Sequence, residues 1–143
     1  MEETMDKELL KYELIKSLSN IYFMDAFSQL TEFLQGELKL LYFLLENENR
    51  KISPSDLSEK LHISRPRTTA ALTTLKNKGY VTTKESIEDR RRIYVRLTPK
   101  GEAFIEKKKD NVEGYFDKYV DSLGEKDTKE LIRLINLSIE IMT

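Results

Sequence analysis

The sequence predicts a mainly α-helical fold that contains one small β-hairpin. Two short helix signals, separated by a tight turn, lie between Ser53 and Gly79. Two alternating strand patterns follow, with three consecutive arginines between them, and long apolar helices flank this middle segment on both sides. Two helices joined by such a turn form a helix-turn-helix, and the hairpin after it would be its wing. The predicted class is therefore a winged helix-turn-helix whose N- and C-terminal helices form a dimerisation region.

The first helix is expected from about residue 5 to residue 30. Its apolar residues spread over more of the helix surface than one core needs, so we expect it to contact both its own domain and a partner subunit. Its aromatic residues can line a ligand cavity or simply fill a core, and the sequence leaves both open. They are Tyr12, Tyr22, Phe23 and Phe27.

A break from Thr31 to Gly36 precedes a second helix, expected from about Glu37 to Glu48. Its many leucines indicate burial against the helix-turn-helix. After a polar loop, Ile52 is expected to form a single-residue strand that joins the later hairpin.

The helix-turn-helix has a start signal for each helix. Ser53 is an N-cap followed by Pro54 at the first helical position, where a missing N–H costs nothing. Ser64 is the N-cap expected for the second helix, the recognition helix, at about residues 65–78. Leu57 and Leu61 face the core from the first helix, and Gly79 ends the second as a C′ glycine.

The wing strands are expected at residues 80–85 and 92–97, where apolar and polar residues alternate. Thr98-Pro99 then starts a helix to Leu123, with Gly114 as a weak point, and a last helix runs from Glu125 to Ile141. Buried positions are expected on the first of these two helices, at Ala103, Phe104, Phe116, Tyr119, Val120 and Leu123.

At 143 residues the chain suits one domain, with residues 36–100 as the winged helix-turn-helix part and residues 1–35 and 101–143 as dimerisation helices. The absence of cysteine excludes disulfides and thiolate metal sites, and His62 is the only histidine, so we expect no cofactor. No apolar run is long enough for a membrane span, and the N-terminus lacks the order of a signal peptide. We expect a cytoplasmic protein with no membrane partner.

The net charge of −1 hides a strong asymmetry. Residues 50–100 hold 13 Lys and Arg against 5 Asp and Glu, whereas the rest of the chain holds 11 against 20. A basic segment that coincides with the helix-turn-helix is the electrostatic footprint of a nucleic-acid face. The predicted partner is double-stranded DNA.

The N-terminal turn of a recognition helix enters the major groove first, so its exposed side carries the expected DNA contacts. Arg65, Arg67 and Thr69 are expected to contact bases or phosphates, and small Ala70 allows close approach or touches a thymine methyl. Ser53, Ser55 and Lys100 are weaker phosphate candidates. The full set on this side of the motif is Ser53, Ser55, Ser64, Arg65, Pro66, Arg67, Thr69, Ala70, Thr73 and Lys100.

Arg90, Arg91 and Arg92 complete the expected DNA-binding set at the wing. If Arg92 starts the return strand, side chains alternate from there, and one or two of the three arginines point outward into a minor groove. Arg90 is expected to pair with Asp89 or with a phosphate and so to hold the shape of the wing.

The chain resembles the MarR family of bacterial transcription regulators. The most specific signal is in the wing, where Asp89-Arg90-Arg91 is followed by Leu97-Thr98 and Lys100-Gly101. The run Leu-Ser-Glu-Lys-Leu-His-Ile-Ser-Arg-Pro from Leu57 and the Lys78-Gly79-Tyr80 junction support it. The residue-level match covers about residues 53–101, and the order of elements matches over nearly the whole chain.

The resemblance implies a homodimer with intertwined first and last helices, DNA release on binding a small aromatic or phenolic ligand, and Arg91 as the groove-inserting residue. The function expected is that of a repressor. Two recognition helices related by a two-fold axis would fit half-sites about one helical turn apart, so we expect a pseudo-palindromic operator. Ala70 and Ala71 depart from the longer polar side chains common in the family, which shifts base readout toward the N-terminal turn. The missing cysteine removes the thiol-oxidation mechanism of one branch.

Two rival classes are an enzyme and a winged-helix protein–protein adaptor. An enzyme needs a convergent set of titratable groups, and a lone histidine without cysteine or a glycine-rich phosphate loop does not supply one. An adaptor has no need of three arginines at the wing or of a strongly basic segment.

Overall fold

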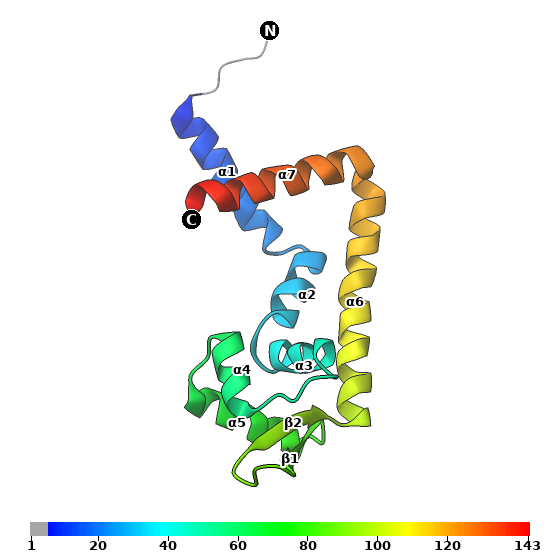
Figure 1. Cartoon of the computed structure of the whole chain (residues 1–143). Helices are drawn as coiled ribbons and strands as arrows, with labels where there is room; N and C mark the ends of the chain where they lie inside the picture. The colour runs from blue at the N-terminus through cyan, green and yellow to red at the C-terminus, as the bar shows by residue number, and fades with distance from the viewer. Residues whose placement is uncertain (1–5) are drawn as a thin grey trace. The chain divides into compact units, whose positions relative to one another are not determined.

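The computed structural model describes residues 6–143 and confirms a mainly helical fold with one antiparallel hairpin (Figure 1). The elements in chain order are α1 (Lys7–Ile21), α2 (Asp25–Phe33), α3 (Gly36–Glu46), α4 (Pro54–Leu61), α5 (Arg65–Asn77), β1 (Val81–Glu85), β2 (Ile93–Leu97), α6 (Pro99–Leu123) and α7 (Glu125–Met142). Among the described residues, no helix is both long and apolar enough to cross a bilayer.

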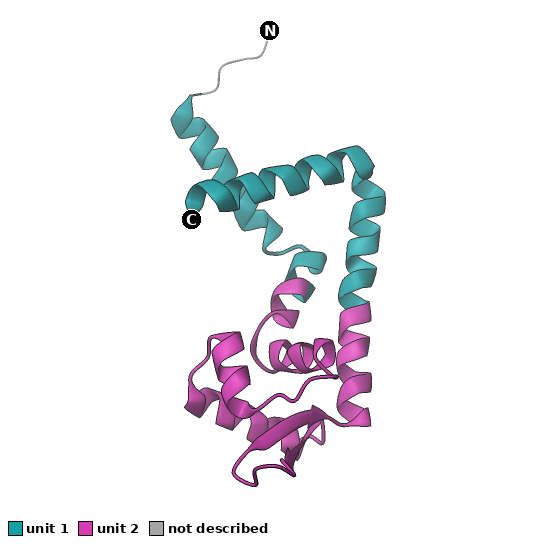
Figure 2. Cartoon of the chain, in the orientation of Figure 1, with its two compact units in different colours: residues 1–29, 111–143 teal, residues 30–110 magenta. Residues whose placement is uncertain are grey.

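The chain divides into two compact units, coloured separately in Figure 2. Residues 30–110 form the winged-helix unit. Residues 111–143, together with the described part of residues 1–29, form the terminal unit. Helices α2 and α6 each begin in one unit and end in the other.

The core of the winged-helix unit comes from the apolar stripes of its helices and from the inner face of the wing. Leu40, Leu41 and Leu44 of α3 meet the leucines of α4 and α5, because residues three and four apart share one face of a helix. The other buried residues of this unit are Phe33, Ile52, Leu57, Leu61, Thr68, Leu72, Leu75, Val81, Ser86, Val95, Gly101 and Ile105.

The wing is a two-stranded sheet with a third, single-residue partner. β1 pairs antiparallel with β2 from Val81 opposite Leu97 to Glu85 opposite Ile93. Ile52 forms an isolated bridge with Val95, whose N–H donates to the Ile52 carbonyl over 2.7 Å, so the expected single-residue strand is confirmed. Each wing strand starts one residue later than expected.

The first part of the chain differs from the sequence-based expectation. Instead of one helix to residue 30, the chain turns at residues 22–24, where the N–H groups of Phe23 and Met24 donate to carbonyls only three residues earlier. The next helix then continues to Phe33, which is buried and packs its ring 4.7 Å from that of Tyr42. The expected start at residue 5 lies outside the described residues.

Helix α6 has the predicted bounds, and Gly114 does not interrupt it. The expectation that Ala103 is buried is wrong, because Gly101 and Ile105 face the core and Ala103 lies on the other side of the helix. Val120 is also exposed. In the terminal unit neither α1 nor α7 has a buried residue.

Candidate nucleic-acid interface

Helix α4 begins with a complete capping box. The Ser53 hydroxyl oxygen accepts the Asp56 N–H over 3.1 Å, and the Asp56 carboxylate accepts the Ser53 N–H over 2.9 Å. Two otherwise unpaired donors of the first turn are thereby satisfied, and Pro54 removes a third. The predicted N-cap is confirmed, and it fixes where Ser53 and Ser55 lie.

The turn between α4 and α5 is held by its backbone conformation and by hydrogen bonds to Ser58. His62 adopts the left-handed conformation with φ of 55°, and the Ser58 hydroxyl donates to the Ile63 carbonyl over 2.7 Å. Ser64 then caps α5 by accepting the Arg67 N–H over 3.3 Å, which confirms the second predicted cap. His62 therefore serves the turn.

Helix α5 is buried on one side and open on the other. Thr68, Leu72 and Leu75 are buried, so α5 is fixed against α3 and α4. All the expected DNA-contact residues at its start and along its outer side are exposed: Ser64, Arg65, Pro66, Arg67, Thr69, Ala70 and Thr73. The arrangement leaves both arginines of the first turn available to a ligand in front of the helix.

The end of α5 is locked to the start of α6. Gly79, with φ of +79°, allows its own N–H to reach the Lys76 carbonyl and that of Tyr80 to reach the Leu75 carbonyl, both over 2.9 Å. The Thr98 hydroxyl donates to the Gly79 carbonyl and accepts the Gly101 N–H. These bonds fix the wing and the recognition helix relative to each other.

Two lysines take part in this junction. The amino group of Lys100 donates to the Lys78 carbonyl over 2.9 Å and lies 5.5 Å from the centre of the Tyr80 ring. Lys78 itself pairs with Glu37 over 2.9 Å, and this hydrogen bond raises the pKa of Lys78 above its ordinary value. Lys100, a predicted phosphate contact, is exposed but already holds a structural bond.

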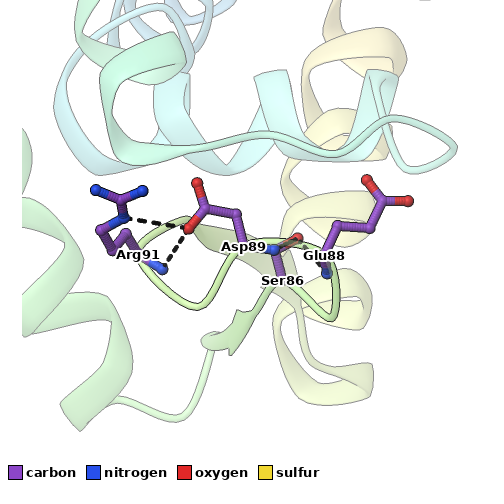
Figure 3. A network of polar contacts seen from close by, with 4 residues as sticks. All are labelled: Ser86, Glu88, Asp89 and Arg91. Atoms are coloured by element: carbon purple, nitrogen blue, oxygen red, sulfur yellow. Dashed lines mark hydrogen bonds and ion pairs between the residues drawn. The ribbon is translucent and has the colours of Figure 1, made fainter.

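The tip of the wing is ordered by Ser86 and Asp89 (Figure 3). The buried Ser86 hydroxyl oxygen accepts the N–H groups of Glu88 and Asp89 over 3.2 and 3.3 Å. Asp89 accepts the Arg91 N–H over 3.0 Å. The Ser86 N–H donates to the Arg92 carbonyl over 2.9 Å, which closes the tip. Ser86 was missed by the sequence analysis, because nothing local distinguishes it from a solvated loop serine.

The expected pairing of Arg90 with Asp89 is wrong. The side chain that pairs with Asp89 is that of Arg91, whose Nε lies 3.5 Å from the Asp89 carboxylate. The reason is the turn itself: Asp89 bonds the backbone N–H two residues later, which brings the Arg91 side chain to the same carboxylate. The Arg91 side chain is 93% exposed, so this ion pair is weak and easily exchanged.

The structure brings the start of α4 and the return side of the wing together around one hollow of about 520 Å³. Ser53 and Ser55 line it from one side and Arg91 and Arg92 from the other. Lys51, which the sequence analysis did not select, adds a third cation to the lining and lies 5.6 Å from the centre of the Tyr94 ring. Asp56 also lines the hollow, and its carboxylate accepts the Ser53 N–H. The three cations outnumber this one carboxylate, so the hollow suits a phosphate group.

The residues expected to bind a small ligand lie in the terminal unit and only partly gather. The Tyr22 ring centre is 5.8 Å from that of Phe23 and 6.4 Å from that of Phe27, while Tyr12 lies ten residues earlier on α1. Tyr12, Tyr22 and Phe23 are more than 60% exposed, so they do not fill a core within one chain. Among the described residues, no group of three His, Cys, Asp or Glu side chains is placed to hold a metal ion.

The comparisons with known proteins find one matching family model and several transcriptional regulators. Residues 35–92 match the model of the MarR family. The chain is 29% identical to the transcriptional repressor YetL of Bacillus subtilis over 72 residues, which cover 50% of this chain and 43% of that protein. It is 31% identical to the HTH-type transcriptional regulator YdgJ of the same organism over 109 residues, covering 76% of this chain and 65% of YdgJ. The chain thus spans less than two thirds of either relative.

Among solved structures, the Staphylococcus aureus MepR–DNA complex has a TM-score of 0.70 at 17% identity and covers 92% of this chain and 99% of the MepR chain. MepR bound to ethidium bromide gives a TM-score of 0.67 at 17% identity, covering 92% of this chain and 96% of that chain. Similarity at this identity establishes the fold. The family match covers residues 35–92, within the winged-helix unit, and the similarity of fold covers 92% of this chain.

Proposed function

We propose that this chain is a transcriptional repressor that binds a pseudo-palindromic operator in double-stranded DNA as a homodimer. The observation that carries the proposal is that two exposed basic segments are held in one rigid arrangement. The exposed first turn of α5 and the arginines of the wing belong to one compact unit, and the junction at Gly79 and Thr98 ties them together.

The recognition helix would enter the major groove with its first turn. Arg65 and Arg67 are exposed there, and arginine can hold guanine through two hydrogen bonds or hold a phosphate. The opposite side of α5 is buried, so the helix presents one face only.

The wing would follow the backbone into the adjacent minor groove. Arg91 is the proposed groove residue, because its side chain is almost fully exposed and its bond to Asp89 can be exchanged for one to DNA. Ser53, Ser55, Lys51 and Arg92, around the neighbouring hollow, would hold a phosphate between the two groove contacts. Arg90 and Lys100 are further phosphate contacts in this proposal.

Dimerisation would use the terminal helices. Apolar side chains of α1 and α7 are between 43% and 69% exposed in the single chain, which a monomer of this size rarely tolerates as continuous surface. They are Leu9, Leu10, Leu14, Ile15 and Leu18 of α1, and Ile132, Leu134, Ile135, Leu137, Ile139 and Ile141 of α7. Covering them by a second copy would bury more than about 2,000 Å², as obligate dimers do.

A small aromatic ligand would regulate the affinity for DNA. Tyr22 and Phe23, both exposed, and Phe27 of α2, which is partly exposed, form an aromatic cluster. MepR, which is similar in fold, has been solved bound to ethidium bromide. Such a ligand weakens DNA binding only by the difference in its affinity for the two dimer shapes, typically about 1–3 kcal/mol. Calorimetry with phenolic compounds, with and without operator, tests this: equal affinity in both conditions would exclude the switch.

A salt titration of duplex binding tests the proposed function as a whole. A protein that neutralises several phosphates loses affinity steeply and linearly on a logarithmic scale as salt rises. A winged-helix protein–protein adaptor, the alternative, would bind random duplex hardly at all. The same titration on a selected site should show a specific affinity above the random background.

A further inference from the structure

The outer face of α5 changes its chemistry along the helix. Its first turn carries Arg65 and Arg67, and its last carries Lys76 and Asn77, all exposed. Between these ends the exposed residues are Thr69, Ala70, Thr73 and Thr74. The middle of the helix therefore presents only methyl groups and threonine hydroxyls to whatever lies in front of it.

Each of these hydroxyls already donates its hydrogen to the helix. Thr69 donates to the Arg65 carbonyl over 3.0 Å, Thr73 to the Thr69 carbonyl over 2.9 Å, and Thr74 to the Ala70 carbonyl over 3.1 Å. A hydroxyl has one hydrogen and two acceptor lone pairs. Turned inward in this way, each keeps acceptor capacity, whereas its donor becomes available only if a hydrogen bond is broken.

The four base pairs differ in how well they meet such a surface. A T·A pair offers a C5-methyl group and the adenine N6 donor in the major groove, and these complement a methyl group and a hydroxyl acceptor. Guanine offers two acceptors, N7 and O6, which would be left without a donor.

We propose that the middle of the recognition helix, through Ala70, Thr69 and Thr73, selects T·A pairs by their methyl groups and excludes guanine. Hydrogen bonds to guanine are then left to the two ends of the helix, with Arg65 and Arg67 at its first turn and Lys76 at its last. This inference rests on the proposed function, because it needs α5 to lie in the major groove. It goes further by assigning which chemical groups of the operator each part of α5 recognises.

The test begins with duplexes selected by the full-length protein from a random library, with footprinting to identify the base pairs under α5. The expected result is thymine or adenine, and no guanine contact, at the positions under the middle of the helix. Each such thymine is then replaced by deoxyuridine, which removes only the methyl group. Where the thymine methyl group contacts α5, its replacement should weaken binding about fourfold, the factor that corresponds to burying one methyl group.

A variant of the protein removes the methyl group that would contact the thymine methyl group. Thr73→Ser deletes the methyl group and keeps the hydroxyl with its inward bond. On the thymine duplex it should also lose about fourfold, and on the deoxyuridine duplex it should bind as the wild type does, because the contact is already gone. Thr143→Ser is the matched control: its hydroxyl makes the same bond, to the Ile139 carbonyl over 2.8 Å, but at the end of α7. It should not change either affinity.

Unchanged affinity after replacing every thymine under α5, or selection of guanine opposite its middle, would overturn the inference while leaving DNA binding intact. If the losses of binding free energy from Thr73→Ser and from the deoxyuridine replacement simply added, the proposed contact between Thr73 and a thymine methyl group would be refuted. A failure of the proposed function shows itself earlier and differently, since no duplex would then be bound in a salt-dependent manner before any thymine is replaced.

Discussion

Gly101→Ala should be one of the most damaging single-methyl changes in this chain. A Cβ at this position would lie 2.0 Å from the Tyr80 carbonyl oxygen, 2.7 Å from the carbonyl carbon and 2.9 Å from the Tyr80 Cα. All three atoms are backbone, so no side chain can move aside. The start of α6 would have to move away from the end of α5.

The cost has two sources. Overpacking costs about 1–3 kcal/mol, and more when backbone must move. The shift also strains the bonds from the Thr98 N–H to the Tyr80 carbonyl and from the Gly101 N–H to the Thr98 hydroxyl, both 3.0 Å, each contributing about 1 kcal/mol. A loss of about 3–5 kcal/mol follows, a large fraction of the total stability of about 5–15 kcal/mol for a typical domain.

The same helix supplies the control. Gly114 has open space around the position of a Cβ and lies inside α6, so Gly114→Ala should be neutral or stabilise by about 0.4–1 kcal/mol. Urea unfolding followed by far-ultraviolet circular dichroism, at one fixed protein concentration, measures both variants. Equal stability of Gly101→Ala and the wild type would refute the close approach of α6 to Tyr80.

Three further predictions concern the DNA-binding face and the dimer. Arg67→Ala should reduce the discrimination between base pairs at one major-groove position by about 1–3 kcal/mol. Arg91→Ala should weaken binding mainly to sites with A·T-rich flanks. Equal losses on all sequences in a binding assay would show that both arginines contact phosphates instead. Ser86→Ala leaves the N–H groups of Glu88 and Asp89 without their acceptor. It should loosen the tip of the wing and weaken DNA binding, while the free energy of unfolding falls by only about 1 kcal/mol. Unchanged affinity for DNA would contradict this role of Ser86. Ile135→Lys should dissociate the dimer in sedimentation experiments at low micromolar concentration, because it places an unpaired charge on the apolar side of α7. Asn136→Lys, on the polar side, should leave the dimer intact. A folded wild-type monomer at this concentration would exclude the dimer altogether.

Local signals in the sequence were enough to predict most elements of the winged-helix unit. Ser53 and Ser64 cap α4 and α5 because a cap needs only its own hydroxyl and an N–H group three residues later. Gly79 ends α5 for a similarly local reason, its positive φ. The bounds of α6 and the alternation of the wing strands followed from the same kind of short-range pattern.

The exposed residues of the candidate interface were also accessible from sequence, since helical spacing separates the buried Thr68, Leu72 and Leu75 from the outer face of α5. The spacing did not predict which hydrogen-bonding groups that face presents. The inward hydroxyls of Thr69 and Thr73 depend on a side-chain rotamer that identity alone does not determine.

Tertiary structure decided the remaining features, each of which joins residues that are distant in the chain or depends on an exact turn. The helix break at residues 22–24 contains no glycine or proline, so no local signal marks it. Asp89 pairs with Arg91 because of the geometry of one turn, and Lys51 and Arg92, with 40 residues between them in the chain, line the same hollow. Gly101 is required by the Tyr80 backbone, which only folding brings within 2.0 Å of the position of its missing Cβ. Local backbone preferences act over a few residues, whereas packing contacts exist only once the chain has folded, so the sequence determined the elements and tertiary structure determined which side chains they bring together.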